Sequence, residues 1–205
     1  MNHQHVWQPS SSGSPKTLLM LHGTGGDEHS LLPLASVLDS EASVLSVRGN
    51  VLEGSAPRLF RRLAEGVFDV ADLIQRTNDL ADFLLDAEAR YNFDRTRMVA
   101  VGYSNGANIA AALLLLRPES LCGGMLVRSM PPLEPETAPN LVGKHVLMLS
   151  GDSDPILPVQ EAQRLQSMFR TYGAEITFEL LRAGHELTRR DVELGQQWLA
   201  SLSAA

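Results

Sequence analysis

A glycine–serine–glycine pattern between a strand and a helix constrains this chain more than any other feature. Residues 102–106 read Gly-Tyr-Ser-Asn-Gly. The apolar, β-branched run 98–101 before them is too short for a helix and predicts a buried strand. The Ala- and Leu-rich run 107–116 after them predicts a helix that ends before Arg117-Pro118. The pattern G-x-S-x-G therefore lies at a strand-to-helix turn, which is the setting in which it presents a serine nucleophile.

Crowding explains the residue types in this turn. Gly102 and Gly106 lack side chains, so the strand and the helix can approach each other closely. We expect Ser104 to hold a strained backbone conformation, with its Oγ above the sheet edge and beside the free N–H groups at the start of the helix. A chance match is the alternative, because glycine and serine are common residues. The predicted strand and helix on either side argue against chance.

The composition fits one globular domain. The chain has 205 residues, of which 44% are hydrophobic and 20% are charged, and this length is enough for one domain with its own core. The net charge is −7, and the longest basic runs are the arginine pairs at 61–62 and 189–190, which argues against a nucleic-acid partner. No stretch approaches the roughly 18 apolar residues of a membrane span. The N-terminus lacks the basic and apolar regions of a signal peptide, so we expect a cytoplasmic protein.

Strands and helices alternate along the chain, without an internal repeat. This order predicts an α/β fold with a doubly wound, mostly parallel sheet and helices on both faces. Residues 1–16 predict a polar leader with a short edge strand at Val6-Trp7, and residues 49–70 predict a long loop. The expected strands are 17–21, 42–47, 98–101, 123–127, 144–150 and 174–181; the expected helices are 30–38, 71–91, 107–116, 158–172 and 188–202.

Three chemically suitable residues, Ser104, Asp154 and His185, each follow a predicted strand. In a doubly wound sheet the site lies beyond the carboxyl ends of the strands, so these side chains should meet there. Serine is a poor nucleophile without a base, and His185 could take its proton. Asp154 would fix the tautomer of the imidazole and stabilise the imidazolium. Asp152 competes for the acid role, and His185 could instead cap a helix.

A glycine-rich loop at residues 22–27 follows the first long strand. It could cradle a phosphate, but it has neither the Gly-Lys-Ser/Thr ending nor the G-x-G-x-x-G spacing of nucleotide sites. We favour an oxyanion hole, in which the backbone N–H groups of Thr24 and Asn105 would bind the developing negative charge. His22 would shape this loop.

We expect no metal site and no cofactor, because the remaining histidines and the cysteine form no cluster with the spacing of metal ligands. His3 and His5 could bind a metal, but their place in the leader argues against it. His29 and His145 are expected to be structural or surface residues. Cys122 is the single cysteine, which excludes an internal disulfide, and its apolar neighbours predict a buried, unreactive thiol.

The segment 49–70 leaves a strand at the catalytic end of the sheet, so it begins beside the site. It is too long and too apolar for an idle surface loop. We expect it to form a wall of the pocket, with Phe60 and Phe68 contacting substrate and restricting the site to small acyl or aryl esters. Alternatively, both rings pack against the helix at 71–91. Its arginines at 58, 61 and 62 could favour an anionic substrate, although such a group more often forms a solvated face.

Four motifs resemble the carboxylesterase/phospholipase family of the α/β-hydrolases, which includes acyl-protein thioesterases: LHGTGGDEH, GYSNGANIA, GDSDPILP and GHELT. The resemblance is closest to small bacterial esterases associated with quinone or metal stress and covers about residues 17–202. It implies a triad of Ser104, Asp154 and His185, in the order typical of this fold. It also implies oxyanion donors at Thr24 and Asn105 and no cofactor. Asn105 stands where acyl-protein thioesterases carry Gln.

The sequence therefore predicts a single-domain serine carboxylesterase that acts on a small-molecule ester. A thioesterase or a lysophospholipase of the same family remains the alternative. A non-catalytic binding protein with the hydrolase fold is a third reading, although such a protein should have lost a triad residue. A homodimer is left open.

Overall fold

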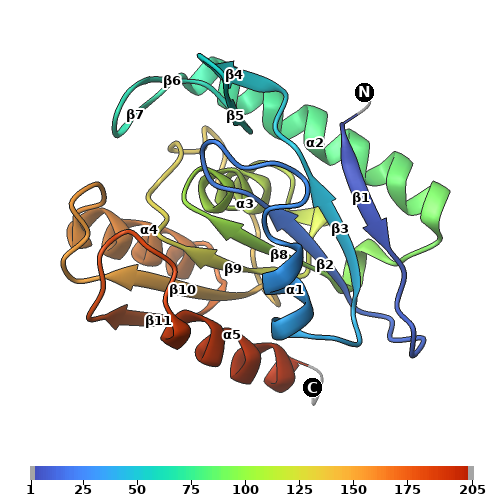
Figure 1. The fold of residues 1–205 in the computed structure, drawn as a ribbon. Helices are drawn as coiled ribbons and strands as arrows, with labels where there is room; N and C mark the ends of the chain where they lie inside the picture. The colour runs from blue at the N-terminus through green and yellow to red at the C-terminus, as the bar shows by residue number, and fades with distance from the viewer. Residues whose placement is uncertain (1–2, 203–205) are drawn as a thin grey trace.

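A seven-stranded sheet forms the centre of the computed structural model, which describes residues 3–202 (Figure 1). The strand order is β1-β3-β2-β8-β9-β10-β11. β1 pairs antiparallel with β3 at one edge, and every other neighbouring pair in this sheet is parallel. The prediction of a mostly parallel sheet with an edge strand near Val6-Trp7 is confirmed. The strands are β1 His5–Gln8, β2 Thr17–Leu21, β3 Ser43–Val47, β8 Met98–Tyr103, β9 Gly123–Val127, β10 His145–Gly151 and β11 Glu175–Leu181.

Helices cover both faces of the sheet, as expected for a doubly wound fold (Figure 1). Alternate side chains of a strand point to opposite faces, and β2 shows the division. Leu18 and Met20 belong to the core under α1 and α5, whereas Leu19 and Leu21 belong to the core under α2, α3 and α4. Burial on both faces is why the central strands read as continuous apolar runs. The helices are α1 Leu32–Leu38, α2 Val70–Tyr91, α3 Asn105–Leu116, α4 Val159–Thr171 and α5 Arg189–Leu202, with 3₁₀ turns at Arg95–Arg97 and Pro118–Ser120.

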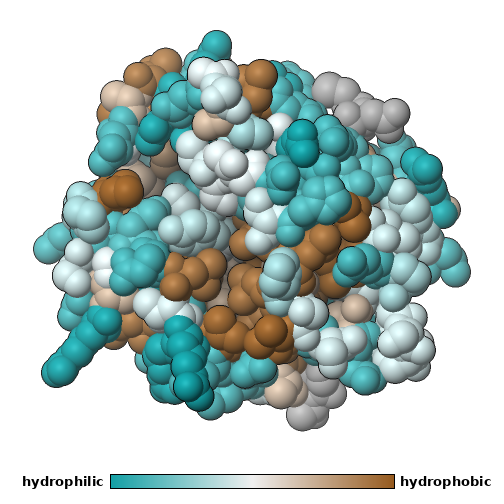
Figure 2. All heavy atoms as spheres, viewed as in Figure 1, coloured by the Kyte–Doolittle hydropathy of each residue, from teal (hydrophilic) through white to brown (hydrophobic). Residues whose placement is uncertain are grey.

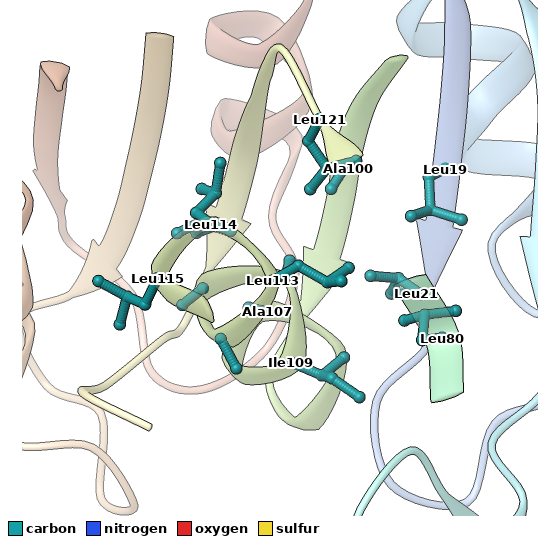
Figure 3. Packing of buried hydrophobic residues seen from close by; sticks show 14 of the residues in the cluster. Leu19, Leu21, Leu80, Ala100, Ala107, Ile109, Leu113, Leu114, Leu115 and Leu121 are labelled. Carbon is teal, nitrogen blue, oxygen red and sulfur yellow. The ribbon is translucent and has the colours of Figure 1, made fainter. Parts of the chain in front are cut away.

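The helix that follows the serine turn, α3, is buried on nearly all sides. A helix that is apolar all round needs such a place. Ile109 and Leu113 of α3 pack among Leu19 and Leu21 of β2 and Leu80 of α2, in the cluster drawn in Figure 3. Protein interiors are close-packed, so this helix has little freedom to shift. The core therefore fixes the N-terminal end of α3, where Ser104 lies.

The segment 49–70 is not a structureless loop, and that part of the prediction is wrong. It forms two hairpins, β4 Val51–Glu53 with β5 Ala56–Arg58 and β6 Arg62–Ala64 with β7 Val67–Phe68. In Figure 1 both hairpins lie above α3. Strands of two or three residues are too short to leave an alternating sequence pattern.

The rest of the surface is mixed. Figure 2 shows apolar residues gathered over and around α1 on the face in view, where Val37 is 54% exposed. Within residues 3–202, no helix is both long enough and apolar enough to cross a membrane.

Candidate functional site

The serine turn has the strained backbone that the sequence predicts. Ser104 has φ 53° and ψ −113°, a conformation that costs energy for any residue with a Cβ. A Cβ on Gly106 would overlap the carbonyl oxygen of Leu21, and one on Gly102 would lie 2.5 Å from the carbonyl oxygen of Gly106. The two glycines are therefore required because β2, β8 and α3 meet backbone to backbone at this point.

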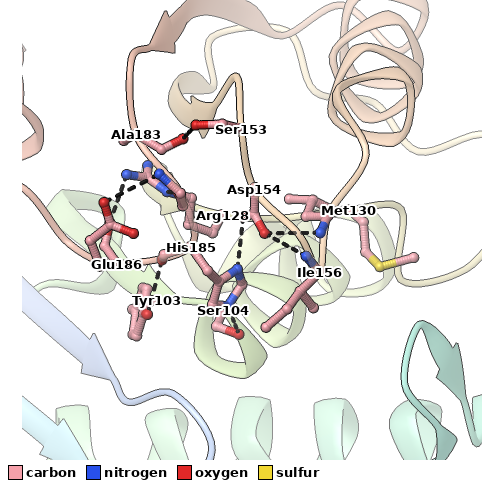
Figure 4. Close-up of polar contacts among 12 residues, drawn as sticks. Tyr103, Ser104, Arg128, Met130, Ser153, Asp154, Ile156, Ala183, His185 and Glu186 are labelled. Carbon is pink, nitrogen blue, oxygen red and sulfur yellow. Dashed lines mark hydrogen bonds and ion pairs between the residues drawn. The ribbon is translucent and has the colours of Figure 1, made fainter.

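Two hydrogen bonds link Ser104, His185 and Asp154 (Figure 4). The Oγ of Ser104 lies 2.9 Å from Nε2 of His185, and Nδ1 of His185 lies 2.8 Å from Oδ2 of Asp154. An ionised carboxylate can only accept, so Nδ1 carries the proton and Nε2 is free to accept from the serine hydroxyl. The geometry thus joins a hydroxyl, a base and an acid in the arrangement of a serine nucleophile.

The acid beside His185 is Asp154, and Asp152 lies elsewhere. The side chain of Asp154 is fully buried. Its Oδ1 accepts from the amides of Ile156 (2.8 Å) and Leu157 (3.0 Å), which leaves Oδ2 for the imidazole. Asp152 is exposed, and in the part of the chain that the structure describes its carboxylate has no contact with His185.

A buried arginine holds the backbone on both sides of His185. Nε of Arg128 donates to the carbonyl oxygen of Gly184 at 2.9 Å, and Nη2 donates to that of Glu186 at 2.8 Å (Figure 4). The same guanidinium forms a bidentate ion pair with Asp191 at the start of α5. Bidentate pairs fix orientation as well as distance. We refer to Arg128 and Asp191 as the buried brace.

Tyr103 completes this support. Its hydroxyl donates to the carbonyl oxygen of His185 itself at 3.0 Å, so three successive carbonyl groups from 184 to 186 are held. Burial raises the pKa of the Tyr103 hydroxyl, which keeps it a donor. Neither Tyr103 nor Arg128 was predicted from the sequence to be a site residue. The sequence holds a signal for Arg128, because it follows β9 just as Ser104, Asp154 and His185 follow β8, β10 and β11.

The two expected oxyanion donors lie together at the site. Thr24 and Asn105 line the same pocket as Ser104. Among residues 3–202, the backbone amide of neither residue has a hydrogen-bond acceptor. Asn105 is the first residue of α3, where amides lack a partner within the helix. Both N–H groups are therefore free to bind an oxyanion.

His22 ties the glycine-rich loop to its neighbours, in line with the expectation that it shapes this loop. Its Nε2 accepts from the amide of Gly49 at 3.0 Å, so Nδ1 carries the proton and donates to the carbonyl oxygen of Gly23 at 2.7 Å. Burial lowers the pKa of His22, which favours this neutral form. The β4–β5 hairpin adds a further bond, from the amide of Gly25 to the carbonyl oxygen of Pro57 at 2.9 Å.

The pocket that Ser104 and His185 line is small, with a volume of about 50 Å³. Phe68 lines it, as expected, but Phe60 does not, and that expectation is corrected. Phe60 is fully buried in the core that includes α2, and its ring meets Phe68 edge-on with centroids 5.1 Å apart. The alternative of packing against the helix therefore holds for Phe60. The other lining residues are Thr24, Arg58, Arg62, Glu65, Gly66, Ser104, Asn105, Asn108, Arg128, Met130, Ile156, Leu157 and His185.

The three arginines of this segment do not form one solvated face. Arg61 is 61% exposed and pairs with Asp69, whereas Arg58 is only 3% exposed. Arg58 donates from Nη1 to Oγ1 of Thr24 at 2.5 Å and from Nε to the carbonyl oxygen of Phe60 at 3.1 Å. Burial lowers its pKa from the usual value. The turn of the hairpins carries Arg58 inward, which no local pattern could reveal.

An apolar groove adjoins the pocket. It has a volume of about 560 Å³ and shares Gly66, Phe68, Met130 and Ile156 with the pocket. In Figure 2 the surface is hollowed beneath the β6–β7 hairpin, at the upper left, where this groove lies. Its further lining residues are Val67, Val70, Pro131, Pro132, Leu133, Pro158, Glu161 and Arg164.

The other residues singled out in the sequence lie away from the site. His3 is buried, and His5 contacts the hydroxyl of Tyr91 at 2.8 Å. His29 and His145 both have exposed side chains. Cys122 is partly buried, and burial raises the pKa of its thiol, as expected for an unreactive cysteine. No group of three His, Cys, Asp or Glu side chains suited to a metal is present within the described residues.

Comparisons with known proteins agree with this architecture. Residues 62–203 match the model of a family described as phospholipase/carboxylesterase. The hydrolase MhqD of Bacillus subtilis (strain 168) is 42% identical over 195 residues, covering 95% of this chain and 96% of that protein. The crystal structure of the Bacillus cereus carboxylesterase aligns with a TM-score of 0.95 at 48% identity, covering 97% of this chain and 94% of the other. The structure of YahD with malic acid aligns with a TM-score of 0.90 at 28% identity, covering 98% of this chain and 99% of the other. The fold is that of the α/β-hydrolases.

Proposed function

Because the chain belongs to the phospholipase/carboxylesterase family of hydrolases, we propose that it is a serine carboxylesterase that hydrolyses small acyl or aryl esters through an acyl-enzyme intermediate. The observation that carries the proposal is the pair of hydrogen bonds from Ser104 through His185 to Asp154. The chemistry requires no cofactor. A cytoplasmic location and a homodimer stay predictions from the sequence.

The first half of the reaction forms the acyl-enzyme. The Oγ of Ser104 attacks the ester carbonyl carbon while Nε2 of His185 accepts the hydroxyl proton. Asp154 stabilises the imidazolium that results. The tetrahedral oxyanion accepts from the amides of Thr24 and Asn105. Collapse of this intermediate breaks the bond to the alcohol oxygen, and His185 delivers its proton to the departing alcohol.

The second half releases the acid. A water molecule loses a proton to His185 and attacks the acyl carbonyl carbon, and the same two amides receive the oxyanion. The bond to Ser104 then breaks, the carboxylic acid leaves, and His185 returns the proton to the serine oxygen. The buried brace and Tyr103 keep His185 in place for both halves, through the carbonyl groups on either side of it.

The sizes of the two hollows support a short acyl group. A volume of about 50 Å³ corresponds to roughly two water molecules at liquid density, which suits an acyl chain of only a few carbons. The apolar groove of about 560 Å³ offers room for a larger alcohol half, such as an aryl group. Phe68 lines both hollows and would separate the two halves of the substrate.

The groove also gives the lysophospholipase or thioesterase alternative its support. If the acyl chain rather than the alcohol occupied the groove, a long chain would fit beside Val67 and Leu133. A non-catalytic binding role has no comparable support, because each triad residue is present and hydrogen-bonded.

The test is the hydrolysis of p-nitrophenyl acetate by wild type, Ser104→Ala and Ser167→Ala. Ser167 is an exposed serine of α4 and serves as the matched control. We expect Ser104→Ala to lose at least about 10³-fold in kcat, as triad residues generally do, and Ser167→Ala to keep wild-type activity. Circular dichroism should show the same fold in all three. A Ser104→Ala protein that retained a tenth of the turnover would overturn the proposal.

A further inference from the structure

We propose that the inner wall of the catalytic pocket binds a carboxylate on the acid half of the substrate, so that the preferred esters are monoesters of short dicarboxylic acids. This inference rests on the proposed esterase function and names its substrate class. Three buried side chains, Arg58, Asn105 and Asn108, carry it.

Arg58 brings a positive charge to the pocket that its surroundings only partly neutralise. Its hydrogen bonds to Oγ1 of Thr24 and the carbonyl oxygen of Phe60 go to neutral acceptors and use Nη1 and Nε. Among residues 3–202, Nη2 has no hydrogen-bond acceptor. Its acidic partner is Glu53, at 3.3 Å from Nη1, and the same carboxylate also pairs with Arg62 at 2.8 Å. Two guanidinium groups thus share the carboxylate of Glu53, whose side chain is itself 44% exposed.

Asn105 adds a buried donor without a partner. Its Oδ1 accepts from the amide of Leu59 at 2.7 Å, which fixes the orientation of the side-chain amide. Nδ2 is then left buried, and within the described residues it has no hydrogen-bond partner. A buried N–H group without an acceptor is unfavourable. A substrate oxygen in the pocket would supply the missing acceptor.

Asn108 lies one helical turn further along α3 and is also oriented by a bond to its side-chain oxygen. Its Oδ1 accepts from the amide of Met130 at 3.0 Å, so Nδ2 is the free end of the amide. In the part of the chain that the structure describes, Nδ2 has no hydrogen-bond acceptor. Asn108, Asn105 and Arg58 all line the pocket with Ser104. The wall therefore presents donors.

A carboxylate matches such a wall better than any neutral group. It is an acceptor with two oxygens and a negative charge, and hydrogen bonds to charged groups are the strong ones. The small volume of the pocket limits the link between the two carbonyl carbons to a few atoms. The carboxylate belongs to the acid half because the side chains that line the adjoining groove are mostly apolar, and the arginine among them, Arg164, is paired with Glu134 and Glu161. Glu65, the acidic residue that lines the pocket, is exposed.

The test compares two esters that differ in charge and hardly in shape, monomethyl succinate and methyl 4-oxopentanoate. We expect wild type to cleave monomethyl succinate with a kcat/KM at least about tenfold higher, the size of effect expected for a hydrogen bond to a charged group. Arg58→Met should bring this ratio close to one. Arg61→Met removes the same charge from the same segment outside the pocket and should leave the ratio unchanged. Arg58 also supports Thr24, so its loss should lower the hydrolysis of both esters. The ratio of the two kcat/KM values cancels this shared effect and reports the carboxylate contact alone.

A second measurement needs no Arg58 variant. Succinate should inhibit the wild-type hydrolysis of p-nitrophenyl acetate competitively, with an inhibition constant at least tenfold lower than that of butyrate. Equal cleavage of the two methyl esters by wild type, or equal inhibition by succinate and butyrate, would overturn the carboxylate site while leaving the esterase intact. Failure of the esterase proposal looks different, since no ester would then depend on Ser104.

Discussion

Arg128 and Asp191 form a bidentate ion pair in which neither side chain is exposed, with Nη1–Oδ1 and Nη2–Oδ2 distances of 2.8 and 3.0 Å. Asp191 also accepts from the amide and the hydroxyl of Thr188, at 2.8 and 2.6 Å. Each charge therefore depends on the other for compensation inside the protein. Because Arg128 also holds the carbonyl groups on both sides of His185, the pair joins the stability of the fold to the position of His185.

Breaking the buried brace on one side should be costly. We expect Asp191→Leu to lower the free energy of unfolding by about 3–5 kcal/mol, because it leaves an uncompensated buried guanidinium. The double variant Arg128→Met/Asp191→Leu should recover much of this loss, since both charges are removed together. Urea denaturation of wild type, both single variants and the double variant measures the coupling.

The same double variant separates stability from positioning. Its recovered stability should not restore activity, because nothing would donate to the carbonyl groups of Gly184 and Glu186. We expect its kcat for p-nitrophenyl acetate to stay at least about tenfold below wild type, since small displacements of a catalytic group are expensive. A stable double variant with wild-type kcat would show that the brace only supports the fold.

The identity of the acid can be tested by a matched pair of substitutions. Asp154→Asn should lower kcat by about 10⁴-fold, because an amide in this place favours the wrong imidazole tautomer. Asp152 lies in the same loop but away from His185. The Asp152→Asn variant should therefore keep wild-type kcat. The reverse result, with Asp152→Asn inactive, would assign the acid to the other aspartate.

Much of the fold could be predicted because its signals are local. β2 is an apolar run buried at all five residues, and the glycines at 102 and 106 mark a turn where backbones touch. The meeting of Ser104, Asp154 and His185 could also be predicted, since each lies within four residues of the carboxyl end of a strand in the parallel part of the sheet. These features depend only on neighbouring residues and on the rule that strand ends meet at one edge.

The features that could not be predicted depend on contacts between distant parts of the chain. Arg58 sits among other arginines and reads as a surface residue, yet the hairpin turns it inward toward Thr24. Arg128 finds its partner 63 residues later in the sequence. Phe60 and Phe68 look alike in the sequence, but only one of them reaches the pocket. In each case tertiary packing decides the environment.

The stability of the fold should fall with acidification in part through His22. Burial lowers the pKa of His22 below its usual value of 6.5. The unfolded chain therefore takes up a proton at a higher pH than the folded protein, so the stability is present above about pH 6.5 and falls as the pH drops below it. His22→Gln keeps an acceptor near the amide of Gly49 but cannot be protonated. Urea denaturation at pH 7.5 and 5.5 should show a smaller loss on acidification in this variant than in wild type.

His3 should also contribute to the loss of stability on acidification. Burial lowers its pKa as well, so part of the acid sensitivity should remain in His22→Gln. Parallel loss of stability in the two proteins between pH 7.5 and 5.5 would mean that His22 is not the group responsible.

The size of the pocket predicts a preference for short acyl chains. In a series of p-nitrophenyl esters from acetate to palmitate, wild type should prefer acetate or butyrate, since the pocket volume is about 50 Å³. Phe68→Ala should move the optimum to longer chains, because Phe68 lies between the pocket and the apolar groove.

Phe60→Ala is the comparison for this series. Its ring is in the core, so the substitution should lower the free energy of unfolding by about 3–5 kcal/mol and leave the preferred chain length unchanged. If wild type preferred palmitate and Phe68→Ala had no effect, the small-ester proposal would be wrong and the lipid-handling alternative would take its place.

The most direct measurement of the central claim is covalent labelling with a fluorophosphonate, which reacts with an activated serine hydroxyl. The site contains one serine hydrogen-bonded to a histidine that is in turn bonded to a buried carboxylate. Mass spectrometry of the digested wild-type protein should therefore find a single phosphonyl adduct, on Ser104, and none in Ser104→Ala. Esterase activity that survives without an adduct at Ser104, or with the adduct on another residue, would contradict the account.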